Sequence, residues 1–303
     1  MTDVRAKRSR KLVLCFSFFC AFALFFSIAA ARVLASELED FKKRGVLRHL
    51  GIPYAKFVTL QQSGLDVELM QRFARHLGVR YEFVQSNWAR VFGDLTGSHI
   101  YPVGDDVKLL GRAEIRGDVI ATGLTILKWR EKIVDYSNPT FPTQVWCIAL
   151  SDSPLKSVES EKSLEVKIRE VKSLLKGQLV MGKAKTCIAP ELYGIDRVAA
   201  RVYDFPGSLD DLAPALLKRL VDVSLIDVPN ALVALSKWKG VFRVLGPVSE
   251  EQRMGVAFRK DSPELLREFN SFFAELKESG EYRGMVLKYY PGVFEYYGEF
   301  FEE

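Results

Sequence analysis

The stretch Gly117–Pro139 reads Gly-Asp-Val-Ile-Ala-Thr-Gly-Leu-Thr-Ile-Leu-Lys-Trp-Arg-Glu-Lys-Ile-Val-Asp-Tyr-Ser-Asn-Pro. It begins with a short β-branched apolar run, Asp118–Ala121, which predicts the end of a buried strand. The sequence Thr-Gly-Leu-Thr follows at residues 122–125, and Arg130 starts a helical turn. Two hydroxyls, a free backbone amide and a planar guanidinium at a strand end suit a carboxylate, although an ordinary surface ion pair of Arg130 would fit the same residues.

Strands and helices are expected to alternate before this stretch. Strands are expected at Val46–Leu50 and Val79–Val84. Between them an apolar stripe with helical spacing covers Leu65–Leu77, and Gly78 ends it as a C-terminal glycine should. This order predicts a parallel α/β sheet, in which ligands lie at the carboxyl ends of the strands.

A second α/β unit is expected further along the chain. Strands are expected at Val145–Leu150, Gln178–Gly182 and Val221–Val228. The residues Lys185-Thr186-Cys187 are expected to open a helix after the second of these strands. A long helical pattern then covers Pro263–Tyr289, with a break at Gly280.

The net charge of +5 comes from the N-terminus. Residues 1–35 hold six of the 43 basic residues and one of the 38 acidic ones, so 37 of each remain. The rest of the chain is neutral overall, which gives no support to nucleic-acid binding.

The N-terminus carries an export signal. Basic residues of Arg5–Lys11 precede an uncharged run, Leu12–Ala31, and Val33-Leu34-Ala35 forms a small-x-small cleavage pattern before Ser36. Residues 1–35 are therefore either a signal peptide or, because the run is about 20 residues long and can span a bilayer, an uncleaved anchor. Either way the protein is expected in the periplasm or on the periplasmic face of the inner membrane.

Two cysteines, Cys147 and Cys187, follow this segment. They form either a disulfide, as an oxidising compartment allows, or two separate buried thiols, and their spacing does not decide between these. The histidines His49, His76 and His99 form no metal-ligand pattern with them, so no metal or cofactor is expected.

The run Gly123-Leu-Thr-Ile, followed by Arg130 and by Val134-Asp-Tyr-Ser-Asn-Pro, resembles the signature of the periplasmic amino-acid-binding proteins, solute-binding protein family 3. The resemblance covers roughly residues 45–290. It implies the type II periplasmic binding protein fold, an α/β fold of two lobes, each a mostly parallel sheet flanked by helices, with two hinge crossings between them. Lobe 1 is then expected over residues 45–143 and 247–303, and lobe 2 over residues 144–246.

The resemblance also implies a function and a set of ligand contacts. The protein would capture a small amino-acid-like ligand, an amino acid or a dicarboxylate, in the interlobe cleft for an ABC importer, and would work as a monomer. Arg130 would bind the ligand α-carboxylate, with Thr122, Gly123 and Thr125 around it. Asp227 would bind the ammonium group, although it would also serve as a helix N-cap. Binding both charges compensates the cost of desolvating a zwitterion, and it links binding to lobe closure.

Further contacts are implied on both sides of the cleft. Tyr54 and Trp88 would sandwich the ligand side chain, with Phe57 as an additional candidate, although ordinary core packing would explain each aromatic residue. Thr186 would meet the carboxylate from a helix N-terminus. Lys185 replaces the family's usual glycine before this threonine, and it would admit an acidic ligand.

The segment Gly97–Arg116 departs from the family pattern and is a local insertion, expected to be a solvated loop near the cleft. Two other functions remain open. The first is a membrane-anchored ligand-sensing module of the same fold that works without an importer. The second is an enzyme resembling cyclohexadienyl dehydratases, whose reaction would need a cleft acid of raised pKa such as Glu68 or Glu131. We expect a binding protein, and the sequence does not name its ligand, permease or signalling partner.

Overall fold

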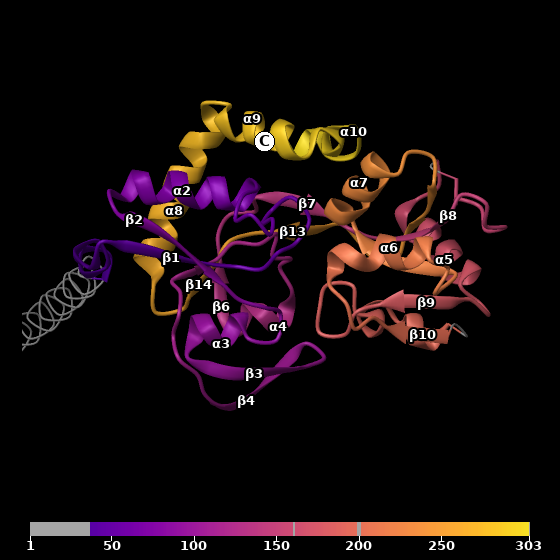
Figure 1. Cartoon of the computed structure of the whole chain (residues 1–303), viewed down its shortest axis with the longest axis horizontal. Coiled ribbons are helices and arrows are strands. Elements are labelled where there is room, and N and C mark those ends of the chain that lie inside the picture. The colour runs from indigo at the N-terminus through magenta and orange to yellow at the C-terminus, as the bar shows by residue number, and fades with distance from the viewer. Residues whose placement is uncertain (1–36, 160, 199–200, 303) are drawn as a thin grey trace, which may run out of the picture.

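The computed structural model describes residues 37–159, 161–198 and 201–302 of the 303-residue chain. It contains two five-stranded sheets with helices on their faces, and these sheets define lobe 1 and lobe 2 (Figure 1). The expected N-terminal signal or anchor segment, residues 1–35, lies outside the described residues. No helix among the described ones is both long enough and apolar enough to cross a bilayer.

In the lobe 1 sheet one strand, second from an edge, runs antiparallel to the other four. Its order is β2 (Arg80–Gln85), β1 (Val46–Gly51), β5 (Val119–Ile120), β14 (Ala257–Arg259) and β6 (Val134–Tyr136). Strand β1 pairs parallel with β2 and β5, whereas β14 pairs antiparallel with β5 and β6. The strand that fills the gap between β5 and β6 therefore comes from the end of the chain.

Helices cover both faces of this sheet. They are α2 (Leu65–Leu77), α3 (Val91–Thr96), α4 (Lys128–Glu131), α8 (Pro263–Glu278) and α9 (Glu281–Tyr289). Helix α2 has the predicted bounds and ends at Gly78 in the left-handed conformation. Its apolar stripe packs on α8, where Phe73 meets Phe269 edge to face at 5.1 Å. The other face is covered by α3 and Trp129 of α4, with Phe92 and Trp129 5.1 Å apart.

The lobe 2 sheet is also mixed. Its order is β10 (Arg201–Asp204), β9 (Leu179–Gly182), β11 (Val223–Asp227), β8 (Val145–Leu150) and β12 (Phe242–Pro247). Strand β9 pairs parallel with β10 and β11, and β8 pairs antiparallel with β11 and β12. The helices of this lobe are α5 (Leu164–Leu174), η1 (Pro190–Tyr193), η2 (Ile195–Arg197), η3 (Leu209–Asp211), α6 (Leu212–Leu217) and α7 (Val228–Lys237).

Two antiparallel strands pass between the lobes. They are β7 (Phe141–Thr143) and β13 (Gln252–Met254), which pair from Phe141 with Met254 to Thr143 with Gln252. The C-terminal turns η4 (Pro291–Val293), α10 (Phe294–Tyr297) and η5 (Gly298–Phe301) lie along these strands (Figure 1). The Tyr297 hydroxyl donates to Gln144 Oε1 at 3.2 Å, so this tail packs on the crossing itself.

The expectation of a solvated loop at Gly97–Arg116 was wrong, because this segment forms a hairpin. Its strands are β3 (Ser98–Val103) and β4 (Asp106–Arg112), joined by two residues, Gly104 and Asp105. Gly104 has a φ of +60°, which a two-residue hairpin turn requires. The hairpin is held because Ile100 and Val107 pack against the apolar cluster on the α3 side of the sheet.

The expected helix at Lys185-Thr186-Cys187 was also wrong. Residues 183–189 form turns, and a short 3-10 helix starts only at Pro190. Lys185 has a φ of +63°, which is incompatible with a helix start, and the Thr186 hydroxyl donates to Lys183 O at 2.7 Å. Thr186 therefore lies in a turn and has no helix N-terminus to offer.

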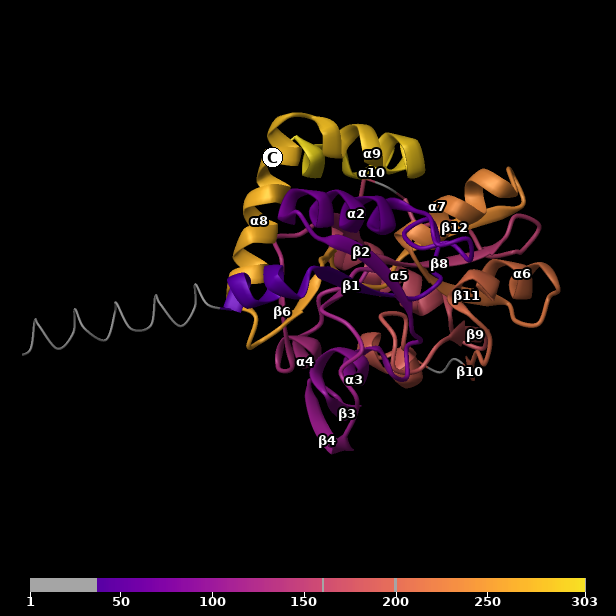
Figure 2. The same cartoon turned by 60° about the vertical axis from the view of Figure 1, so that its left-hand side comes forward.

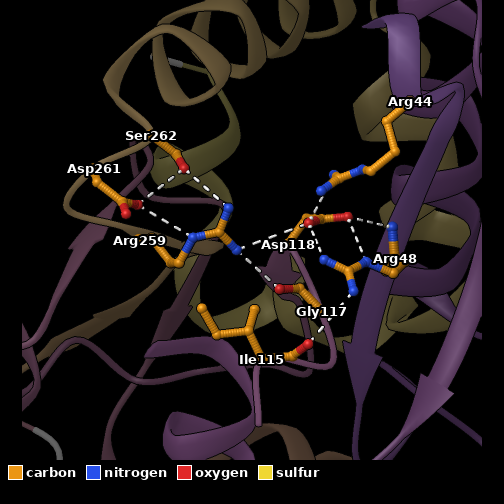
Figure 3. A network of polar contacts seen from close by, with 8 residues as sticks. All are labelled: Arg44, Arg48, Ile115, Gly117, Asp118, Arg259, Asp261 and Ser262. Carbon is orange, nitrogen blue, oxygen red and sulfur yellow. Dashed lines mark hydrogen bonds and ion pairs between the residues drawn. The ribbon is translucent and has the colours of Figure 1, made fainter. Parts of the chain in front are cut away.

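A buried carboxylate joins three parts of lobe 1 (Figure 3). Asp118, just before β5, is fully buried, and its Oδ1 lies 2.8 Å from Arg44, 2.9 Å from Arg48 and 3.7 Å from Arg259. Arg48 also donates its backbone N–H to Asp118 Oδ2 at 2.9 Å. This network fixes the start of β5 against β1 and β14, and residues 122–125 leave from the other end of the same strand.

Candidate functional site

Arg130 lies on α4, just after the turn that ends β5. It is 1% exposed, and its Nη1 donates to Thr125 O at 2.7 Å. Its guanidinium carbon lies 5.2, 5.5 and 5.9 Å from the ring centres of Trp129, Phe92 and Trp88. Its Nε has no hydrogen-bond partner, and no carboxylate of the described residues forms an ion pair with it.

A buried guanidinium without an anion is costly. The aromatic rings around it replace only part of the hydration that the charge loses on burial. The Oγ1 of Thr125, 1% exposed, also lacks a partner. An open guanidinium N–H beside an open hydroxyl matches the hydrogen-bonding needs of a carboxylate.

Asp227 approaches the same region from lobe 2. It ends β11 at the start of α7, and it is 2% exposed. Burial raises the pKa of its carboxyl to about 7, against smaller lowering effects of backbone N–H groups including that of Asn230. The Tyr54 hydroxyl of lobe 1 donates to Asp227 Oδ2, which links the two lobes through this residue.

Cys187 lies between the two charged groups. Its Sγ is 3.6 Å from Asp227 Oδ2, and burial raises the pKa of its thiol while the charge of Arg130 opposes that rise. Arg130 and Asp227 thus act on one buried thiol, although they belong to different lobes. Cys187 and Cys147 are both free and buried, so the disulfide alternative is not what the structure holds. Sequence reasoning treated Cys187 only as a disulfide or core residue and missed this position.

The aromatic candidates Tyr54, Phe57 and Trp88 cluster at the lobe 1 side. Tyr54 meets Trp88 edge to face at 6.0 Å and stacks on Phe57 at 5.8 Å. Trp88 is half-buried, whereas Phe57 is fully buried and packs on Phe141 and Tyr290. Tyr54 and Trp88 therefore border the Asp227 and Arg130 groups, while Phe57 supports them from the core.

The polar groups of Thr122 and Gly123 form hydrogen bonds within lobe 1. The Thr122 hydroxyl donates to Ile52 O at 2.7 Å and accepts from Ile52 N at 3.2 Å. The Gly123 N–H donates to Asp66 Oδ2 at 2.6 Å. Burial raises the pKa of Asp66 to about 7, and the Gly123 N–H partly offsets this rise. Asp66, on the first turn of α2, was not among the sequence candidates, and it holds the turn from which Thr125 and Arg130 extend.

The other two lobe 2 candidates, Thr186 and Lys185, differ in exposure. Thr186 is buried, and its hydroxyl is shared between Lys183 O and Ile188 N. Lys185 is exposed, and its Nζ lies 4.6 Å from the ring centre of Tyr101 on strand β3 of the hairpin. The Lys185 side chain therefore reaches toward the hairpin of lobe 1, while the Thr186 hydroxyl is bonded within its own turn.

Glu68 does not fit the cleft acid of raised pKa that a dehydratase-like reaction would need. Burial alone would raise the pKa of Glu68, but hydrogen bonds from Lys288, Tyr289 and Arg72 bring it below its usual range. Glu131 is exposed. The acids that burial brings to a pKa of about 7 near this region are Asp66 and Asp227.

Comparison with known proteins extends this picture. Residues 109–292 match the profile described as bacterial extracellular solute-binding proteins, family 3. The membrane-bound lytic murein transglycosylase F of Desulfosudis oleivorans is 27% identical over 231 residues, which are 76% of this chain and 44% of that protein. The chain thus spans less than half of the transglycosylase. The L-cystine-binding protein TcyJ of Escherichia coli is 23% identical over 75% of this chain and 74% of its own length.

A solved structure confirms the two-lobed architecture. A crystal structure of a mutant of ArgBP from T. maritima superposes with a TM-score of 0.65, covering 84% of this chain and 99% of that one. Its sequence identity is 24%, so this likeness concerns the fold.

Proposed function

The chain belongs to the bacterial extracellular solute-binding proteins of family 3, and on that premise we propose that it captures an amino acid between its lobes and delivers it to an ABC importer. In this proposal the protein works outside the cytoplasm, in the periplasm, with residues 1–35 as its signal peptide or anchor.

One observation carries the proposal: Arg130 is buried and charged, and no carboxylate of the described residues pairs with it. Leaving a buried charge without its partner costs several kcal/mol, on the order of the 3–5 kcal/mol measured when a buried pair is broken. A ligand α-carboxylate on Arg130 and Thr125 would recover that cost. The binding site therefore gains more from an anion than from a neutral ligand.

Asp227 is proposed to hold the ligand ammonium. It lies on the opposite lobe, so a zwitterion between Arg130 and Asp227 contacts both lobes at once. Ligand binding would then favour the closed arrangement, because an open cleft offers only one of the two charges. Tyr54 and Trp88 would flank the ligand side chain, while Thr122, Gly123 and Thr186 keep the surrounding turns in place.

The protein is first unfolded and refolded to remove any bound ligand. The test then measures its Tm in the presence of each of the twenty amino acids and a set of dicarboxylates. A ligand that binds only the folded state raises the Tm as its concentration passes Kd. We expect one amino acid class to raise the Tm of the wild type, Arg130→Met to abolish the shift, and Asp227→Asn to reduce it strongly. Arg90→Met, at a half-exposed arginine near the site, is the matched control and should keep it. Failure of every zwitterion to shift the Tm contradicts the proposal.

A second candidate is an anchored sensing module. The match to part of a lytic transglycosylase supports it, because a related domain there belongs to a larger protein. The long apolar run Leu12–Ala31 supports it as well. Uptake of the radiolabelled ligand by cells that lack the gene separates the two: loss of uptake supports the importer role, and unchanged uptake supports the sensor.

A further inference from the structure

The β3–β4 hairpin is fixed against the helix that carries Arg130. Asp105 in its turn lies 3.6 Å from Lys128 Nζ, and Asp106 lies 3.0 Å from Lys132 Nζ. The two lysines flank Arg130 on α4 and at its end. Exposed ion pairs of this kind contribute little, so the packing of Ile100 and Val107 holds the hairpin, and the two pairs lie where its turn meets α4. Figure 2 shows the hairpin projecting beyond α3 and α4.

A cavity of about 190 Å³ lies between this hairpin and lobe 2. Tyr101 and Trp129 line it from lobe 1, and Lys185, Thr186 and Glu191 line it from lobe 2. Lys185 Nζ rests over the Tyr101 ring at 4.6 Å. Among the described residues neither Lys185 nor Glu191 forms an ion pair, so the cavity offers one ammonium group, in contact with an aromatic ring, and one carboxylate, neither of them neutralised by an opposite charge.

This cavity adjoins the Arg130 and Asp227 site on both sides. On lobe 1 its wall is Trp129, whose ring contacts the Arg130 guanidinium. On lobe 2 its wall includes Thr186, and the next residue, Cys187, contacts Asp227. The cavity that holds Lys185 and Glu191 thus shares one wall with Arg130 through Trp129, and on lobe 2 Thr186 joins it to Cys187, the neighbour of Asp227.

We propose that the ligand is an amino acid whose side chain ends in a second ammonium–carboxylate head group. The inner head pairs with Arg130 and Asp227, and the outer head places its carboxylate on Lys185 and its ammonium on Glu191. Tyr101 covers the outer head from the hairpin. This inference rests on the proposed function and specifies its ligand class: an amino acid with one head group leaves the charges of the outer cavity unused.

Three ligands of graded charge test the inference by calorimetric titration of the purified, ligand-stripped protein. LL-2,6-diaminopimelate has both outer charges, L-lysine lacks the outer carboxylate, and L-norleucine lacks both. Diaminopimelate is preferred to cystine as the two-headed probe because it has no disulfide that could exchange with the Cys187 thiol. We expect diaminopimelate to bind about tenfold more tightly than L-lysine, and both to exceed L-norleucine.

Two variants and one control assign the effect to residues. Lys185→Met should remove the preference for diaminopimelate over L-lysine, and Glu191→Gln should weaken binding of both. Lys239→Met, at an exposed lysine in the turn after α7, should change neither. Arg130→Met should abolish binding of every ligand, because it removes the inner site.

The outcomes separate the inference from the proposed function. Equal affinities for the three ligands, unchanged in Lys185→Met but lost in Arg130→Met, overturn the inference and leave the proposed function in place. A one-headed amino acid that binds more tightly than diaminopimelate and cystine overturns it as well. If no amino acid binds, the proposed function fails, and the inference fails with it.

Discussion

The phenolic hydroxyl of Tyr54 in lobe 1 donates a hydrogen bond to the carboxylate of Asp227 in lobe 2. Both residues are buried, with 1% and 2% of their surface exposed. The group proposed to hold the ligand ammonium is thus also the group that ties the lobes together. A hydrogen bond to a charged partner contributes about 1.5–3 kcal/mol, enough to change the ratio of closed to open molecules by roughly ten- to a hundredfold.

Removing that hydrogen bond should open the ligand-free protein. We expect Tyr54→Phe to increase the radius of gyration of the stripped protein in small-angle scattering, and added ligand to restore the compact value. Tyr101→Phe keeps the ring that contacts Lys185 and serves as the control. Identical scattering from wild type and Tyr54→Phe would show that other contacts hold the lobes together.

Arg130→Met should stabilise the ligand-free protein while it removes binding. Replacing buried ionic groups by apolar residues of similar volume is often neutral or stabilising by about 1–4 kcal/mol. Urea unfolding of the stripped protein measures this change. A clear loss of stability would mean that Arg130 serves mainly lobe 1 packing, through Thr125 O and the three rings around it.

Ligand affinity should fall as the pH drops below about 7. Burial raises the pKa of Asp227 to about 7, so its carboxyl is neutral at lower pH and no longer compensates a ligand ammonium. The loss approaches about tenfold per pH unit below the pKa. Burial lowers the pKa of His49 to about 4, so it does not contribute between pH 5 and 8.

Asp66 is the necessary control for this pH profile, because its pKa is also about 7. Asp66→Asn keeps an oxygen that accepts from the Gly123 N–H, so it should retain the pH dependence. Asp227→Asn should bind weakly with a flat profile between pH 5 and 8. A flat profile in the wild type would contradict the assignment of Asp227 to the ammonium.

Gly123→Ala should cost more stability than Gly104→Ala. The two glycines have nearly the same backbone angle, φ of +59° and +60°. A Cβ at Gly123 would lie 2.3 Å from the Phe57 ring, whereas nothing lies within 4 Å of a Cβ at Gly104. We expect about 1 kcal/mol for the left-handed backbone alone at Gly104, and a further 1–3 kcal/mol of overpacking at Gly123. Urea unfolding of both variants measures the difference, and equal costs would show that Phe57 moves aside freely.

Local sequence signals predicted much of the framework. The apolar stripe of Leu65–Leu77 predicted the bounds of α2 correctly, because one face of that helix is buried along its whole length. The Ser208 and Asp211 side chains form a reciprocal cap at the start of η3, a pattern that can be read locally in the sequence. Gly280 separates α8 from α9 in the left-handed conformation. The fold class of two lobes is confirmed by the family and by the solved structure.

The errors arose where tertiary contacts decided the backbone. A positive φ at Lys185 prevents a helix at Thr186, and nothing local indicates that angle for a lysine. The hairpin had a local signal, the two-residue Gly104-Asp105 turn, but its strands are mostly exposed and lack a clear alternation of apolar residues. Cys187 and Asp66 were missed as site residues because their importance depends on neighbours 40 and 57 positions away in the sequence. The assigned ligand contacts and lobe boundaries remain predictions.

Strand β14 lies between β5 and β6, although more than a hundred residues separate it from either along the chain. During synthesis the sheet of lobe 1 thus stays incomplete until β14 is made, after all the strands of the lobe 2 sheet. Until residue 259 emerges, β5 and β6 have exposed edges, which attract chaperones and also invite wrong pairing. The second lobe, whose strands are contiguous from Val145 to Pro247, is complete first. The order of translation therefore runs opposite to the order of assembly: the half of the protein that begins the chain is the last to close.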